Sequence, residues 1–152
     1  MLIQTLKPIF DDKNLTLKMI DFMRSLYRQI DDQIGQVQNT CQNCRRCCDF
    51  ALSGLNLYLT NLEMAFFITQ VNTVPDSVTE QCPWLDDQSG CTIRHARPIG
   101  CRTYFCKPPA NYDQQTIYED ALRQVKSFLG KNELPYAYVE WLKALREYKN
   151  HL

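Results

Sequence analysis

The amino-acid sequence predicts a mainly α protein with a small α+β character, in which helices pack around an irregular, cysteine-rich loop segment. Near both ends of the chain, apolar residues recur every three or four positions, as they do along one face of an amphipathic helix. All eight cysteines lie between Cys41 and Cys106, and most of the second half of that stretch shows no periodicity. The fold should therefore combine two helical ends with a middle that regular secondary structure alone does not fix.

The length and composition set the scale of this fold. A chain of 152 residues, with 45% hydrophobic and 22% charged residues, is expected to form a single domain, residues 1–152, with a real core. Within it we expect a cysteine-cluster core at 41–106 and flanking helices at 12–38 and 113–150. The 17 basic and 17 acidic residues give a net charge of +0, which argues against nucleic acid as a partner.

The N-terminal flank carries the clearest helical pattern. Between Leu15 and Val37, apolar residues follow one another at steps of three or four, and charged residues take the other faces. This stripe consists of Met19, Met23, Leu26, Ile30, Ile34 and Val37. It predicts a helix that packs against the core.

The middle of the chain begins with short regular elements. Leucines alternate with other residues over 55–59, which predicts a short half-buried strand. Thr60 and Glu63 then form a T-x-x-E capping box, which predicts the start of a helix. From Cys82 to Cys106, prolines and glycines recur at short intervals, and we expect irregular loops there.

The C-terminal flank is predicted to form two helices. Apolar residues step by four, four and three through Ile117, Ala121, Val125 and Phe128. Gly130 follows at the position where this first helix would stop. The second helix is expected to start near Pro135, because proline is favoured in the first helical turn.

The first cysteine cluster has the spacing of a metal-binding loop. Two residues between cysteines, as in C-x2-C-x2-C, let the chain turn so that the thiolates face one metal. The adjacent Cys47 and Cys48 point to opposite sides of an extended chain, so we do not expect both to bind one tetrahedral ion. A bound metal would also fix the irregular loops and give a metal-stabilised segment. The candidate metal ligands are Cys41, Cys44, Cys47, Cys48, Cys82, Cys91, Cys101 and Cys106.

The expected compartment decides how these cysteines are interpreted. The N-terminus lacks the basic start, apolar run and cleavage site of a secretory signal, and no segment is apolar enough for a membrane span. We therefore expect a cytoplasmic protein without membrane association, whose thiols stay reduced. That expectation argues against four disulfides, although the even number of cysteines would allow them.

The order of the motifs resembles that of a known family. CxxCxxCC is followed by CP and a hydrophobic residue, then by C-x-I, and then by RP-x-x-CR-x-x-x-C. This order is similar to that of the CxxCxxCC (YkgJ-type) family, which is described as zinc- or iron-chelating. The chain has Arg46 where family members often have glycine, and Arg94 where they often have tyrosine. The resemblance implies metal chelation and says little about a reaction.

The donor set favours an iron–sulfur cluster. The C-x2-C-x2-C run and the all-thiolate supply are typical of such clusters, with 4Fe-4S favoured and zinc as the alternative. Both histidines look peripheral, which argues against zinc held by cysteine and histidine together. Arg97 and Arg102 are the candidate cofactor-binding residues, because cations inside the motif would stabilise a negatively charged thiolate centre.

Three functions remain open at this point. The first is a metal-binding cysteine-cluster protein that carries an iron–sulfur cluster in a redox or cluster-dependent role, with an unknown protein or redox partner. The second is a structural zinc-binding module that mediates protein interaction, although a closed zinc site uses only four thiols. The third is cysteine-based catalysis or redox sensing, for which Cys101 beside Arg102 is the best candidate. Whether the chain is an enzyme stays undecided.

Overall fold

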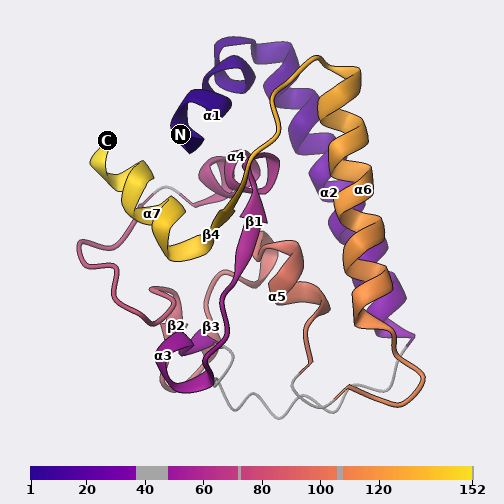
Figure 1. Cartoon of the computed structure of the whole chain (residues 1–152), viewed down its shortest axis with the longest axis vertical. Coiled ribbons are helices and arrows are strands. Elements are labelled where there is room, and N and C mark those ends of the chain that lie inside the picture. The colour runs from indigo at the N-terminus through magenta and orange to yellow at the C-terminus, as the bar shows by residue number, and fades with distance from the viewer. Residues whose placement is uncertain (37–47, 72, 106–107, 152) are drawn as a thin grey trace.

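The computed structural model describes residues 1–36, 48–71, 73–105 and 108–151, and it confirms a mainly helical fold with little strand (Figure 1). Two long helices, α2 (Lys13–Gly35) and α6 (Gln114–Lys131), lie side by side and run in opposite directions. Phe22 and Phe128 stack between them, with ring centroids 4.5 Å apart. This helix pair forms one side of the molecule.

The predicted N-terminal stripe is confirmed from Met19 to Ile30, whereas Ile34 is partly buried and Val37 lies outside the described residues. Asp12 caps α2 by accepting hydrogen bonds from the backbone N–H groups of Asn14 and Leu15. The residues of the stripe that the helix buries are Met19, Met23, Leu26 and Ile30. The helix ends at Gly35, and residues 37–38 of the predicted flank lie outside the described residues.

Three shorter helices complete the core. They are α1 (Leu2–Asp11), which the sequence analysis did not predict, α4 (Asn61–Gln70) and α7 (Trp141–Asn150). Helix α1 buries Leu2, Leu6 and Ile9 against α2, α4 and α7. Helix α4 is the most central element, because Asn61 to Phe67 are all buried. Its predicted capping box is confirmed: the Thr60 hydroxyl accepts from the Glu63 N–H, and the Glu63 carboxylate accepts from the Thr60 N–H.

The strand prediction is confirmed in its burial pattern and shifted in its bounds. Exposure alternates over 55–59 as expected, but the paired strand is β1 (Tyr58–Thr60). It pairs antiparallel with β4 (Tyr138–Glu140), which matches Leu59 to Val139. Only the three residues of β1 have a partner in β4, so the ladder starts three residues later than the sequence pattern.

Both predicted boundaries in the C-terminal flank were wrong. Helix α6 runs past Gly130 to Lys131, and Glu133 takes the left-handed conformation with φ 54°. The Leu134 N–H donates to the Leu129 carbonyl and the Glu133 N–H to that of Gly130, which is a Schellman ending. The following helix does not begin near Pro135, because residues 138–140 pair with β1 first. Glu140 then caps α7.

The stretch from residue 82 to 105 contains more regular structure than predicted. A hairpin joins β2 (Leu85–Asp86) to β3 (Gly90–Cys91), and the Asp86 carboxylate shapes its turn by accepting from the Gln88 and Ser89 N–H groups. A 3-10 turn, η2 (Arg94–Ala96), leads into the short helix α5 (Ile99–Thr103). Helix α3 (Phe50–Ser53) precedes β1.

None of the described helices has both the length and the apolar character that a membrane span requires.

Candidate functional site

A pocket of about 360 Å³ brings together cysteines from four separate segments. Cys48 precedes α3, Cys82 precedes β2, Cys91 ends β3 and Cys101 lies on α5. None of these four is in a disulfide. The predicted ligands Cys41, Cys44, Cys47 and Cys106 lie outside the described residues.

Cys48 and Cys82 face each other across a short antiparallel bridge. Asp49 pairs with Gln81, the Cys82 N–H donates to the Cys48 carbonyl at 2.9 Å, and the Phe50 N–H donates to the carbonyl of Glu80 at 3.1 Å. Residues that lie directly opposite in such a pair send their side chains to the same face. The fold therefore sets these two thiols side by side, although they are 34 positions apart in the sequence.

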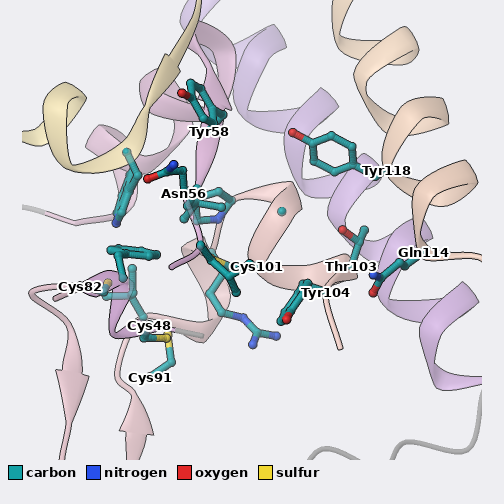
Figure 2. Close-up of a pocket in the computed structure, with 18 of the residues that line it drawn as sticks. Cys48, Asn56, Tyr58, Cys82, Cys91, Cys101, Thr103, Tyr104, Gln114 and Tyr118 are labelled. Atoms are coloured by element: carbon teal, nitrogen blue, oxygen red, sulfur yellow. The ribbon is translucent and has the colours of Figure 1, made fainter. Parts of the chain in front are cut away.

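The hairpin brings Cys91 to the same side of the pocket. Leu85 pairs with Cys91 across β2 and β3, and the Leu85 N–H donates to the Cys82 carbonyl at 3.1 Å. Figure 2 shows Cys48, Cys82 and Cys91 on one side of the pocket, with Cys101 between them and the opposite wall. We call this side the thiol side.

Buried Glu63 fixes the position of the helix that carries Cys101. One carboxylate oxygen accepts from the Ile99 N–H at 2.7 Å, in the first turn of α5, and the other accepts from the Thr60 N–H at 2.7 Å. Burial raises the pKa of Glu63, and these hydrogen bonds to its charged form oppose that rise. One carboxylate thus joins the start of α4 to the start of α5.

A small residue lets α5 approach β1. A Cβ atom added to Gly100 would lie 2.7 Å from Cδ1 of Leu57, which is closer than carbon atoms tolerate. Gly100 and Leu57 both line the pocket. Gly100, one of the glycines from which irregular loops were predicted, therefore allows a close contact in the pocket wall.

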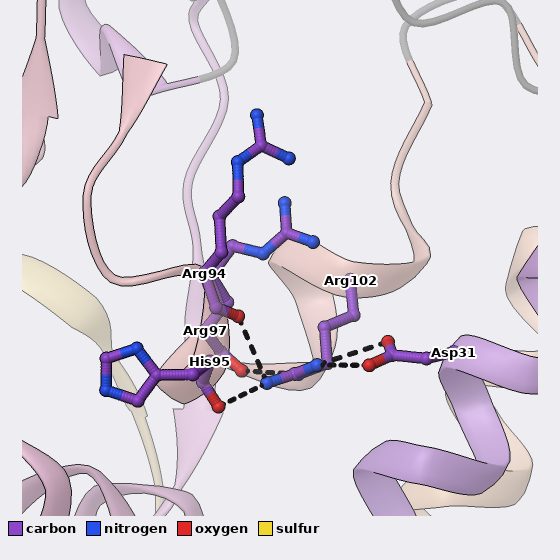
Figure 3. Close-up of polar contacts among 5 residues, drawn as sticks. All are labelled: Asp31, Arg94, His95, Arg97 and Arg102. Carbon is purple, nitrogen blue, oxygen red and sulfur yellow. Dashed lines mark hydrogen bonds and ion pairs between the residues drawn. The ribbon is translucent and has the colours of Figure 1, made fainter. Parts of the chain in front are cut away.

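Arg102 holds the loop before α5 against α2 (Figure 3). Its side chain is 3% exposed, and its guanidinium donates to both carboxylate oxygens of Asp31 at 2.9 and 3.1 Å. The guanidinium also lies 3.8 Å from the centre of the Tyr27 ring. Its remaining hydrogen bonds go to the backbone carbonyls of Arg94, His95 and Arg97. Arg102 is not among the described residues that line the pocket, and its predicted role at a cofactor stays a prediction.

Arg97 does line the pocket, and it is the only charged side chain among the described residues that do so. Its Nε is buried and has no hydrogen-bond partner within the described part of the chain. Trp141, another lining residue, also has a buried, unpartnered indole N–H there. A buried donor without an acceptor is uncommon and calls for an explanation.

The wall opposite the thiol side is aromatic and polar, and the sequence analysis did not predict it. Figure 2 shows Thr103, Gln114 and Tyr118 there. The hydroxyls of Tyr118 and Tyr138 are hydrogen-bonded to each other, and Tyr138 stacks on Tyr58 with centroids 5.4 Å apart. The tyrosine spacing in the sequence carries no signal for this wall, because Tyr58 and Tyr138 meet through the β1–β4 pairing and Tyr118 comes from α6.

Metal binding itself stays a prediction. Within residues 1–36, 48–71, 73–105 and 108–151, no three cysteine, histidine or acidic side chains form a group that could hold one ion. Four of the eight predicted ligands lie outside these ranges. The predicted ligands that are described do share one pocket.

Comparisons with protein-family models, with curated proteins and with solved structures gave no match to this chain.

Proposed function

We propose that this chain binds a metal centre through its cysteines, with an iron–sulfur cluster as the centre and a redox or cluster-dependent role. The observation that carries this proposal is the meeting of Cys48, Cys82, Cys91 and Cys101 on one pocket. A core needs small apolar side chains at many places and gives no reason to gather thiols at one of them. Ligands for a metal centre must converge.

The surroundings of these cysteines suit a thiolate-bound centre. Such a centre is negatively charged, and a mostly apolar pocket stabilises that charge only where a cation or N–H donors are near. Arg97 supplies a positive charge on the pocket wall, and its buried Nε has no partner among the described residues. We assign Cys48, Cys82, Cys91 and Cys101, together with Cys41, Cys44, Cys47 and Cys106, as the pool of candidate ligands.

An iron–sulfur cluster is favoured over zinc by the number and pattern of thiols. A closed zinc site uses four, whereas this chain has eight, and its first three cysteines follow C-x2-C-x2-C. When bound, a cluster supplies one-electron transfer at a potential tuned by nearby charge and hydrogen bonds. A structural zinc-binding module that mediates protein interaction is the alternative.

Metal analysis tests this proposal directly. Protein purified without oxygen from iron-supplemented cells is expected to be brown, with several irons and a comparable amount of acid-labile sulfide per chain. Colourless protein with one or two zinc ions would favour the zinc-binding module instead. Protein with neither metal and with all eight thiols reactive would contradict both.

A pair of variants in the hairpin region tests the ligands. Cys82→Ser should lower metal affinity by more than the roughly 10–100-fold that loss of an outer partner costs. Thr92→Ser is the matched control, because Thr92 is exposed beside Cys91 and serine keeps the hydroxyl that donates to the Trp84 carbonyl. Equal metal content in the two variants would remove Cys82 from the ligand set.

A further inference from the structure

The pocket extends well beyond its thiol side. Its volume of about 360 Å³ falls in the range of small-molecule sites, about 300–1,000 Å³. The opposite wall is built by α5 and α6, where Thr103, Gln114 and Tyr118 stand away from Cys48 and Cys82 (Figure 2). A centre on the thiol side would use only part of this space.

The unsatisfied polar groups of the pocket residues are donors. The Arg97 Nε–H and the Trp141 indole N–H are buried without a partner in the part of the chain that the structure describes. Neither group can accept a hydrogen bond. A molecule that satisfies donors of this kind must bring acceptor atoms.

The tyrosine pair adds a third donor. Tyr118 and Tyr138 have two O–H groups between them, and their mutual hydrogen bond uses one. The other O–H is therefore left for a different acceptor. Burial and the hydrogen bond to Tyr138 raise the pKa of Tyr118, so its hydroxyl keeps its proton at neutral pH.

The charge and the shape of the pocket lining further limit the kind of molecule that it can bind. Among the described lining residues, Arg97 carries the only charge and no aspartate or glutamate is present, so the field favours an anion. The rest of the lining is mainly apolar, and it is rich in rings that suit a planar body. The aromatic residues that line the pocket are Phe50, Tyr58, Tyr104, Tyr118, Tyr138 and Trp141.

We propose that this pocket binds a small organic anion with a planar apolar body, of which an aromatic carboxylate is the simplest form. Its carboxylate accepts from Arg97, and its body packs among the aromatic rings of the wall, where the Tyr118–Tyr138 pair offers a further donor. This goes beyond the proposed metal centre and does not require it, because the donors belong to the polypeptide.

Benzoate and benzamide are the probes, since they share a shape and differ in charge. Ligand-observed NMR and tryptophan fluorescence of the full chain should show saturable benzoate binding with a Kd of about 1 mM or tighter. Benzamide should bind about tenfold more weakly or worse, because it lacks the charge that Arg97 attracts. Equal affinity for both probes, or no saturable benzoate binding, would overturn the proposal.

Variants of the donors locate the site. Arg97→Gln should weaken benzoate binding about tenfold or more, Arg97→Lys should weaken it less, and Tyr118→Phe should cost about tenfold or less. Arg94→Gln is the control, because Arg94 is exposed, does not line the pocket and contributes only its carbonyl to Arg102. Unchanged benzoate affinity in folded Arg97→Gln and Tyr118→Phe proteins would also overturn the proposal.

Metal content, measured on the same samples, separates this inference from the proposed function. Benzoate binding by protein that takes up no metal would leave the anion site standing and remove the metal centre. Protein that is purified with metal and does not bind benzoate, either as purified or after chelation, would support the metal centre and remove the anion site. Circular dichroism and thermal melting confirm that each variant is folded before its affinity is counted.

Discussion

The helical frame and the cysteine-lined pocket are held together by different kinds of interaction. The frame, made of α1, α2, α4, α6 and α7, is joined by buried apolar side chains such as Met23, Val125 and Leu145. The pocket segments, residues 48–60 and 82–105, add Leu59, Ile93 and Ile99 to this core, and they also depend on a few polar side chains with specific partners. Glu63 and Arg102 are the clearest of these, since each bonds backbone groups of α5 or of the loop before it.

This difference separates stability from the shape of the site. Apolar burial is non-directional and spread over many residues, so the frame is expected to fold with or without a metal. A directional contact fails when one partner is lost, and the buried groups that remain lose their hydrogen bonds. The pocket should therefore be sensitive to single polar substitutions that leave the frame helical.

The largest effect is expected at Arg102. Arg102→Gln removes a buried guanidinium that bonds three backbone carbonyls and Asp31, and it should lower the free energy of unfolding by about 3 kcal/mol. Urea titration followed by circular dichroism measures this change. The thiols on the pocket should react faster with a thiol reagent at urea concentrations below the main transition.

Asp31→Asn provides the matched control. The Asp31 side chain is 52% exposed, so loss of its charge should cost less than about 1 kcal/mol. Similar costs for Arg102→Gln and Asp31→Asn would mean that the ion pair, and not the carbonyl contacts, holds the loop. The contrast between the frame and the pocket would then be weaker than the structure indicates.

The frame could be predicted from the sequence where periodicity alone determines burial. The stripe on α2 and the capping box at Thr60 are local patterns, and both are present. The predicted helix end at Gly130 was wrong because α6 continues to Lys131 and ends in a Schellman motif, with Glu133 in the left-handed conformation and Leu134 packed against the core. The start near Pro135 failed because strand pairing with β1 is a long-range contact that no local signal reports.

The cysteines of the candidate site could be predicted from the sequence, and the walls of the pocket could not. The eight cysteines were visible as candidate ligands, and the four that the structure describes share a pocket. Arg97 and Arg102 were given the same role from their places in one motif, yet their guanidiniums go to different surroundings. Only Arg97 lines the pocket, whereas Arg102 is used by Asp31 and by backbone carbonyls. The position of an arginine in the motif therefore does not determine whether its side chain lines the pocket or packs elsewhere.

A smaller effect is expected at Gly100, where the pocket wall is tight. Gly100→Ala places a methyl group against Leu57, which has to shift, and should lower the free energy of unfolding by about 1 kcal/mol. Gly130→Ala is the matched control in the frame, because nothing lies within 4 Å of the added Cβ. Gly130 lies in the last turn of α6, and alanine is the better helix former, so that control should raise stability by about 0.5 kcal/mol or less. Stabilisation by both substitutions would show that the Leu57 side chain can move away from the added methyl group at little cost.

An effect of about the same size, and the most informative about how α4 of the frame is connected to α5 of the pocket, is the pH dependence due to Glu63. Burial raises the pKa of this carboxyl in the folded protein, so the folded state keeps the proton at a pH where the unfolded chain has released it. The contribution of Glu63 to stability is therefore fully present below the unfolded-state pKa. It is lost as pH rises through the folded-state pKa.

Glu63→Gln isolates this contribution, because glutamine is neutral at every pH and keeps one acceptor for the two N–H donors of Thr60 and Ile99. The variant should be less stable than the natural chain by about 1 kcal/mol near pH 4, and the gap should narrow towards pH 7. Two other titratable side chains face this site. The positive charge of Arg102 lowers the pKa of Glu63, and the negative charge of Glu63 raises the pKa of Tyr27. Urea titrations of both proteins across this range measure the gap. A gap that widens with pH would mean that the hydrogen bonds to the carboxylate outweigh its burial, and that α5 is held by a charge.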